Sequence, residues 1–269
     1  MVLNWIYNKV SSFDDINRFE RIWKLAQVDF KKRYYNDKFG LAWAFLNPVI
    51  RVMVFYLVFT YVIERSRLGI DNFALFLFSA LIFWMAFVEL IKKNMKILKT
   101  KGYLIKNLQV NKIDLFVSNA IASFLGLLFN LVSYTFVSLA FGTNISFKNL
   151  LFLPIIIIII YLIGVGIGMF LSICLIFFND INHLVDIIIL IGFWTSGVLF
   201  PSTKILEIWS PLYYLNPFLG IFENVRNILV YNSDINLTIL SINLTMAIFI
   251  YIGGYSLMNK YYQLAFEKL

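Results

Sequence analysis

Long runs of apolar residues recur along the chain and limit what it can fold into. A helix needs about 20 apolar residues to cross the hydrocarbon core of a bilayer. Charged residues make up only 14% of the 269 residues, whereas soluble domains average about 25%. We therefore predict an all-α membrane protein with six transmembrane helices. Their approximate bounds are 41–63, 73–91, 115–141, 151–178, 184–200 and 237–258.

The distribution of Lys and Arg predicts which side of the membrane each loop faces. Of the 23 basic residues, 17 fall before the first span, between the second and third, or after the last, and five fall in the opposite loops. Cytoplasmic loops carry the excess of Lys and Arg. We therefore expect both termini in the cytoplasm, because a five-span topology would move a basic cluster outside. The net charge of +8 serves orientation, and no nucleic-acid partner is expected.

Residues 1–40 are predicted to form a cytoplasmic, amphipathic interface segment. Apolar side chains recur there at helical spacing, with basic side chains on much of the remaining surface. The apolar positions are Ile16, Phe19, Ile22, Trp23, Ala26 and Phe30, and the basic positions are Arg18, Arg21, Lys24, Lys31 and Lys32. Such a helix suits the boundary between acyl chains and anionic lipid headgroups. It is either a membrane anchor alone or also a docking surface for a cytoplasmic partner.

The transmembrane domain, residues 41–269, contains two unusual connecting segments. Residues 92–114 are basic and polar, and they are long enough for one or two short helices. They form either a solvated loop or a cytoplasmic coupling loop that contacts a partner. Residues 201–236 are too apolar for a free loop and are interrupted by Pro211 and Pro217. Helical spacing of Phe218, Phe222, Val225 and Leu229 then predicts a short external re-entrant hairpin, which either enters the outer leaflet or packs on the bundle.

The sequence lacks the motifs of an enzyme. None of its 13 glycines is followed by Lys, so it has no phosphate-binding loop of the G-x-x-x-x-G-K-[ST] kind. Gly164, Gly166 and Gly168 lie within a predicted span, where small residues allow helices to pack closely. Cys174 and His183 are each the single residue of their type, which excludes an intrachain disulfide and an ordinary metal site. We expect no catalytic residue, metal or cofactor in this chain.

Two features are candidates for a substrate path. Arg51 falls near the middle of the first span, where a charge either has a functional role or snorkels or pairs within the bundle. Aromatic residues make up 18% of the chain, more than interfacial belts require. Aromatic side chains near the predicted external mouth would let the apolar faces of sugars pass without tight binding. These residues are Trp194, Phe200, Trp209, Tyr213, Tyr214, Phe218 and Phe222.

Several short motifs occur in the order found in one membrane-protein family. They are Lys32-Arg33-Tyr34-Tyr35, Phe39-Gly40-Leu41-Ala42-Trp43, Leu46-Asn47-Pro48, Asn179-Asp180, and Tyr214-Leu215-Asn216-Pro217 followed by Arg226. In this order the chain resembles the ABC-transporter permeases that export bacterial polysaccharides. Asn179 replaces the Arg of the family's Arg-Asp pair, and Leu108-Gln109-Val110-Asn111-Lys112 lacks the family's aromatic-Pro pair.

The resemblance implies a subunit of the bacterial inner membrane rather than an enzyme. It would form a homodimer, bind two ATP-binding cassette subunits that hold ATP and Mg, and export a lipid-linked glycan such as O-antigen, capsule or teichoic acid. A drug or ion exporter and an integral-membrane glycosyltransferase are the alternatives. Residues expected to couple the chain to the ATPase are Phe19, Arg21, Trp23, Phe30, Lys32, Arg33, Lys101, Lys106 and Asp180.

Overall fold

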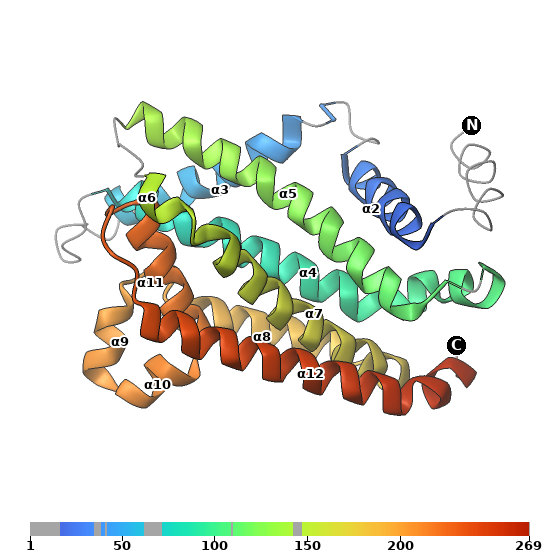
Figure 1. Ribbon diagram of the computed structural model, residues 1–269. Coiled ribbons are helices and arrows are strands. Elements are labelled where there is room, and N and C mark those ends of the chain that lie inside the picture. Colours follow the sequence, from blue (N-terminus) through green and yellow to red (C-terminus); the bar gives the residue numbers. More distant parts are fainter. Residues whose placement is uncertain are drawn as a thin grey trace.

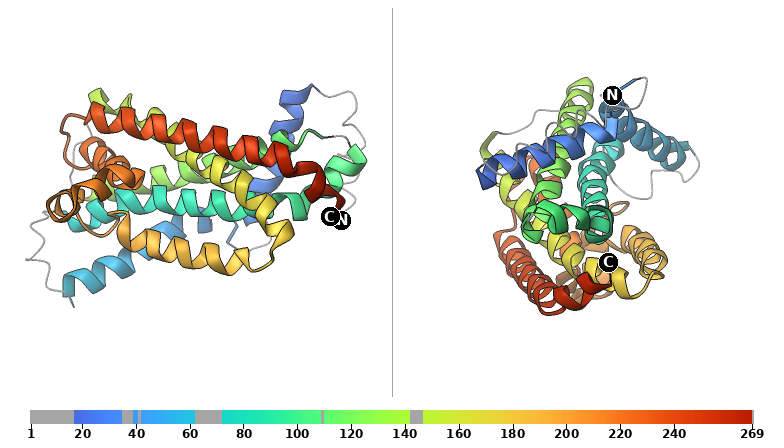
Figure 2. Two further views of the ribbon diagram at one scale, coloured as in Figure 1. Left: turned by 90° about the horizontal axis from the view of Figure 1, so that it is seen from below. Right: turned by 90° about the vertical axis from the view of Figure 1, so that its right-hand side faces the viewer.

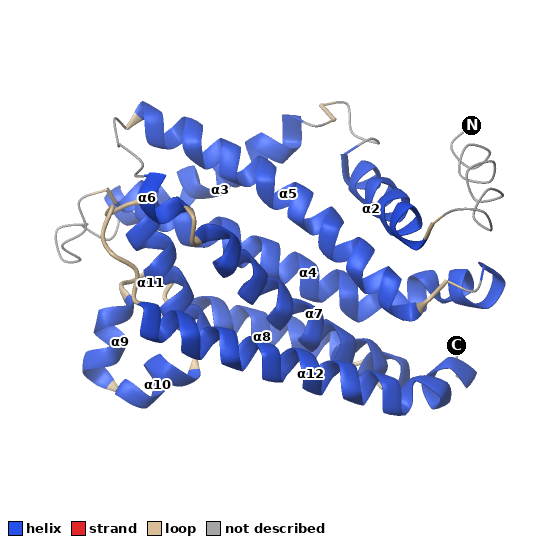
Figure 3. Cartoon of the chain, in the orientation of Figure 1, coloured by secondary structure: helices blue, strands red, loops and turns tan. Residues whose placement is uncertain are grey.

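The computed structural model describes residues 17–34, 39–40, 42–61, 72–108, 110–141 and 147–268, and every regular element within these ranges is a helix (Figures 1 and 3). The helices are α2 (Arg18–Tyr34), α3 (Ala42–Tyr61), α4 (Phe73–Leu108), α5 (Lys112–Ala140), α6 (Phe147–Leu150), α7 (Leu153–Phe177), α8 (Ile181–Thr195), α9 (Ser202–Ile208), α10 (Ser210–Leu215), α11 (Pro217–Leu229) and α12 (Leu237–Glu267). The all-α prediction is confirmed for this part of the chain.

Six of the helices, α3, α4, α5, α7, α8 and α12, run along one long axis (Figures 1 and 2). Among the described residues, four of them, α4, α5, α7 and α12, are long and apolar enough to cross a membrane. The chain is therefore a multi-pass membrane protein. The apolar helices α3 and α8 coincide with the other two predicted spans but are shorter.

Helix α4 corrects the prediction for residues 92–114. That segment was expected to be a loop with one or two short helices, but α4 continues unbroken through it as far as Leu108. The cause is an apolar stripe that persists beyond the predicted span, because Met95, Ile97, Leu98 and Leu104 are all buried. The lysines of this segment are thus fixed on a helix, and α12 likewise continues beyond its predicted end to Glu267.

The glycines of α7 allow its backbone to pack closely against α12 and α4. A Cβ atom on Gly166 would lie 2.7 Å from the carbonyl oxygen of Ile250, and one on Gly254 would lie 2.0 Å from the carbonyl oxygen of Gly166. Backbone atoms cannot move aside as a flexible side chain can. A Cβ on Gly168 would lie 2.4 Å from the Cβ of Asn94 on α4. The packing role predicted for these glycines is therefore confirmed.

The two ends of the bundle differ in character. We call the end that carries α2 and the α4 segment after Ile91 the basic end, and the end that carries α9, α10 and α11 the opposite end (Figure 1). Helix α11 packs inward, with Phe222, Val225 and Leu229 buried and Phe218 half-buried. The predicted apolar face of this segment thus packs on the bundle, whereas entry into a lipid leaflet stays a prediction.

Arg226 ties the opposite end together. It falls in the segment 201–236 that was predicted to be an external hairpin, and the structure buries it to 2% exposure. Its Nη2 donates hydrogen bonds of 2.8 Å to the carbonyl oxygens of Gly197 and Val198, and its Nε donates to that of Phe76 at 3.3 Å. Its guanidinium carbon lies 3.5 Å from the centre of the Phe76 ring. Burial lowers the pKa of Arg226 to about 9, so it stays charged at neutral pH.

We expect Gly254→Leu to destabilise the protein much more than Gly253→Leu. A side chain at position 254 would force α7 and α12 apart, whereas a Cβ at position 253 meets no atom within 4 Å. Overpacking of this kind costs about 1–3 kcal/mol or more. Thermal unfolding of the detergent-purified variants measures the difference, and equal midpoints would contradict the proposed contact.

Arg226→Met should lower stability by about 3 kcal/mol or more, because buried carbonyl groups would lose their charged donor. Arg226→Lys should recover only part of the loss, since one ammonium group cannot reproduce the planar fork of donors. The midpoint of thermal unfolding tests both variants. A stable Met variant would mean that the carbonyl groups find other donors.

Candidate functional site

Helix α2 lies against the bundle at the basic end with its apolar side inward. Ile22 and Ala26 are buried, and the ring of Phe30 stacks on Phe129 of α5 with 5.6 Å between centroids. Phe19 and Trp23 point away, with 74% and 40% of their surfaces exposed. The predicted helix is therefore confirmed from Arg18 onward, but its apolar positions divide, since Ile22 and Ala26 pack on the bundle and Phe19 and Trp23 do not. Residues 1–16 lie outside the described part, and the position of the helix at the membrane interface stays a prediction.

One buried carboxylate near the start of α5 anchors the beginning of α2. Asp114 has a fully buried side chain, and its Oδ1 accepts hydrogen bonds from Arg18 Nη2 at 2.8 Å and Arg18 Nε at 3.0 Å. Arg21 Nη2 lies 3.7 Å from Oδ2. The hydrogen bonds and charge of Asp114 raise the pKa of Arg18. Hydrogen bonds between ionised groups of this kind are about twice as strong as neutral ones.

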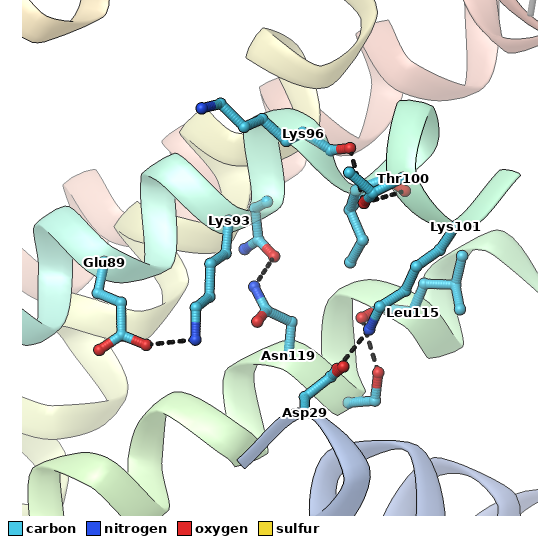
Figure 4. A network of polar contacts seen from close by, with 11 residues as sticks. Asp29, Glu89, Lys93, Lys96, Thr100, Lys101, Leu115 and Asn119 are labelled. Carbon is cyan, nitrogen blue, oxygen red and sulfur yellow. Dashed lines mark hydrogen bonds and ion pairs between the residues drawn. The ribbon is translucent and has the colours of Figure 1, made fainter. Parts of the chain in front are cut away.

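Two further ion pairs anchor the end of α2 to α4. Asp29 pairs with Lys101, and Arg33 pairs with Glu89. The Lys93 ammonium lies 2.7 Å from the Glu89 carboxylate (Figure 4), so Arg33 and Lys93 share this carboxylate. A Cβ on Gly126 of α5 would lie 2.4 Å from Arg33 Nη1. The absence of a side chain at position 126 therefore makes room for Arg33.

The predicted coupling residues fall into separate groups. Arg21, Phe30, Arg33 and Lys101 hold α2 to the bundle, whereas Phe19, Trp23 and Lys32 are exposed. Lys106 lies 5.2 Å from the ring centre of Phe266 on α12. Asp180 is exposed just before α8, and its side chain makes no capping hydrogen bond. The structure thus brings together Arg21, Arg33 and Lys101 at the attachment of α2, and Asn179, next to Asp180, accepts a hydrogen bond from Lys99 of α4.

A cavity of about 970 Å³ lies between α3, α4, α5 and α8. Arg51 lines it, together with Asn47 of α3, Asn130 of α5 and Glu89 of α4. Arg51 is exposed and makes no ion pair with any residue in the described ranges. The predicted intramembrane arginine therefore faces a cavity with polar groups on several walls.

The predicted aromatic path is only partly present as a surface. Trp194, Trp209 and Tyr214 are exposed, and Phe200 and Phe218 are half-buried. Phe222 is fully buried and Tyr213 is 5% exposed, so these two pack inside the protein and line no surface. Tyr213 instead donates a hydrogen bond of 2.8 Å to Glu223 Oε2. Helical spacing identified the apolar face of α11, but it could not distinguish a face that packs inside the protein from one that lines a substrate path.

Several residues at these sites escaped the sequence reasoning. Trp84 and Phe193 line the cavity, and their rings lie 6.3 Å apart. The ring of Phe218 lies 5.3 Å from that of Trp84, which links α11 to the cavity wall. Asp29 of α2 and Asp114 of α5 form ion pairs that attach α2 to the bundle. The sequence could have indicated them, because each is an acidic residue within a strongly basic segment.

Comparison with known proteins supports a transport role. A model of the family described as ABC-2 type transporter matches residues 20–230. The chain is 26% identical over 245 residues to an O-antigen export system permease protein RfbA of Klebsiella pneumoniae, with 90% of this chain and 92% of that protein covered. A protein of the same name from Myxococcus xanthus is 24% identical over 206 residues, which cover 76% of this chain and 78% of that protein. This chain therefore belongs to the ABC-2 type transporter family, a family of permeases that implies an ATP-binding cassette partner.

Proposed function

We propose that this chain is the membrane subunit of an ATP-driven exporter that moves a lipid-linked polysaccharide of the O-antigen type across the bacterial inner membrane. In this proposal the chain spans the bilayer six times with both termini in the cytoplasm. Two copies form a homodimer, and two ATP-binding subunits, which hold ATP and Mg, attach at the basic end. The excess of Lys and Arg at that end supports this orientation.

The observation that carries the proposal is the attachment of α2 to the spanning helices. Asp29 and Arg33 of α2 pair with α4, and Arg18 pairs with Asp114 of α5. The exposed Phe19 and Trp23 leave the outer side of α2 available to a partner or to lipid. A partner that moves α2 would therefore move α4 and α5 with it, which is what an external motor requires.

The exposed faces of α3 and α8 support a dimer built around the cavity. Val185 is the one buried residue of α8, whereas Ile187, Ile188 and Ile191 are more than half exposed. On α3, Met53 and Val54 are also more than half exposed. A second copy packed along these helices would close the cavity that Arg51 lines and turn it into a path shared by both protomers.

The cargo is proposed from the relatives and from the aromatic surface. The relatives are named as O-antigen export permeases, and the exposed Trp194, Trp209 and Tyr214 lie at or beyond the end of α8. Aromatic faces bind the apolar faces of sugars without strong hydrogen bonds. Export of teichoic acid, capsule, a drug or an ion, and integral-membrane glycosyl transfer, are the alternative outcomes of the test.

Co-expression with the ATP-binding subunit of the proposed exporter tests the proposal directly. We expect the two proteins to co-purify in equal numbers, and deletion of this chain to leave the lipid-linked glycan inside the cell. Cell-surface labelling of the glycan measures export, and gel filtration with light scattering measures stoichiometry. Intact glycan export after deletion, without any complex, would contradict the proposal.

Reversal of one ion pair tests whether α2 carries the coupling. Asp29→Lys or Lys101→Asp alone should reduce export at least about tenfold, because each places two like charges in contact. The double variant Asp29→Lys/Lys101→Asp should recover much of the activity, since it restores an opposite pair. Export and ATP hydrolysis are measured in the assembled complex, and a double variant no better than the singles would refute a role for the pair.

A further inference from the structure

A second pocket, of about 480 Å³, lies between α2, α4 and α5 at the basic end. We call it the basic pocket. Its lining residues from α2 are Asp29, Lys32 and Arg33, those from α4 are Lys92, Lys93, Lys96, Ile97, Thr100 and Lys101, and the one from α5 is Asn119. It is distinct from the larger cavity, although Arg33 and Lys92 contribute to both.

The basic pocket has more cations than the neighbouring carboxylates balance. Six of its lining residues are Lys or Arg. The acids that pair with them are Asp29, which holds Lys101, Glu89, which Arg33 and Lys93 share, and Asp186, which lies 2.7 Å from Lys92. Three positive charges are thus left over. Lys32 makes no ion pair with any residue the structure describes.

Part of the pocket's positive charge is buried, whereas Lys32 and Lys96, which pair with no carboxylate in the described ranges, are exposed. The side chains of Arg33 and Lys101 are only 17% and 19% exposed, and Asn119 is 3% exposed. Like charges repel more strongly where water is partly excluded. Figure 4 shows the Lys93 ammonium extending from α4 toward Glu89 and the Lys101 ammonium meeting Asp29. An anion with several acceptor oxygens would relieve this repulsion and bridge the two helices.

We propose that the basic pocket binds the phosphate group of an anionic membrane lipid. Phosphate oxygens accept charge-assisted hydrogen bonds from Arg and Lys. The same helix, α2, exposes Phe19 and Trp23, and an amphipathic helix with such side chains lies at the level of the lipid headgroups. Basic pockets between transmembrane helices on the cytoplasmic side bind the headgroups of anionic lipids in other membrane proteins. Free phosphate has the same chemistry, and the experiment separates the two sources.

Occupancy of the pocket bears on the attachment of α2. A phosphate held by Lys32 and Arg33 on one side and Lys93 on the other adds a third connection to the pairs made by Asp29 and Arg33. Lipid would thus fasten α2 to α4 more tightly than the protein does alone. This inference concerns the membrane lipid and not the exported cargo, so it stands or falls independently of the proposed substrate.

Native mass spectrometry of the full-length, detergent-purified chain tests the proposal with phosphatidylglycerol as the probe and phosphatidylcholine as the neutral comparison. We expect Lys32→Gln/Lys93→Gln to weaken phosphatidylglycerol binding about tenfold, because two lysines near a lipid phosphate are lost. The matched control is Lys24→Gln/Lys99→Gln, which also removes one lysine from α2 and one from α4. Lys24 pairs with Glu20 and Lys99 donates to Asn179, and neither lines the basic pocket.

The control and one further variant decide the result. Retained binding in Lys24→Gln/Lys99→Gln and in Lys32→Arg/Lys93→Arg supports the pocket, and the Arg variant shows that charge rather than packing is needed. Equal weakening in both Gln variants would mean general attraction to a basic surface and would overturn the proposal. Displacement of the lipid by an equal concentration of inorganic phosphate would overturn the lipid as the source.

Discussion

The attachment of α2 to the spanning helices is the constraint on which the proposed mechanism depends. An amphipathic helix on a membrane surface transmits no movement unless it is tied to what crosses the membrane. Here the ties are ion pairs to Asp114, Lys101 and Glu89, with one aromatic contact between Phe30 and Phe129. Ion pairs suit this task because they direct α2 to one register and still exchange partners as the helices shift.

The opposite end is held in a different way. Arg226 donates hydrogen bonds to carbonyl oxygens in the turn between α8 and α9 and to that of Phe76 on α4. In this turn Gly197 adopts a positive φ of 75°. Hydrogen bonds to buried carbonyl groups have no solvent to replace them, so this end is rigid. The Gly166–Gly254 contact fixes α7 and α12 as a second rigid unit. Movement is therefore expected at α2, α3 and α8, which have fewer buried side chains than α4, α5, α7, α11 and α12.

Much of the fold could be predicted from the sequence, because apolar runs and the excess of Lys and Arg are local signals. Six apolar helices overlap the predicted runs, although α4 and α12 extend further and α8 ends earlier, and α2 is helical with Ile22 and Ala26 of its predicted apolar face buried. The unbroken course of α4 was not predicted, because the lysines between them make the segment with the buried Met95, Ile97 and Leu98 read as polar. The ion pairs join residues 72 and 96 positions apart, and no periodicity encodes such pairings. The burial of Arg226 was missed for the same reason, since its acceptors are carbonyl groups of residues far away in the sequence, on α4 and after α8.

Helix α4 connects the two ends directly. Its 36 residues correspond to about 54 Å at 1.5 Å per residue. Phe76 near its start accepts the hydrogen bond from Arg226, and Lys101 near its end binds Asp29 of α2. Glu89 between them pairs with Arg33 and also lines the larger cavity beside Arg51. A displacement of α2 thus acts on α4, which also forms part of the cavity wall and reaches the opposite end of the bundle. No flexible loop lies between these points of α4 to absorb the movement.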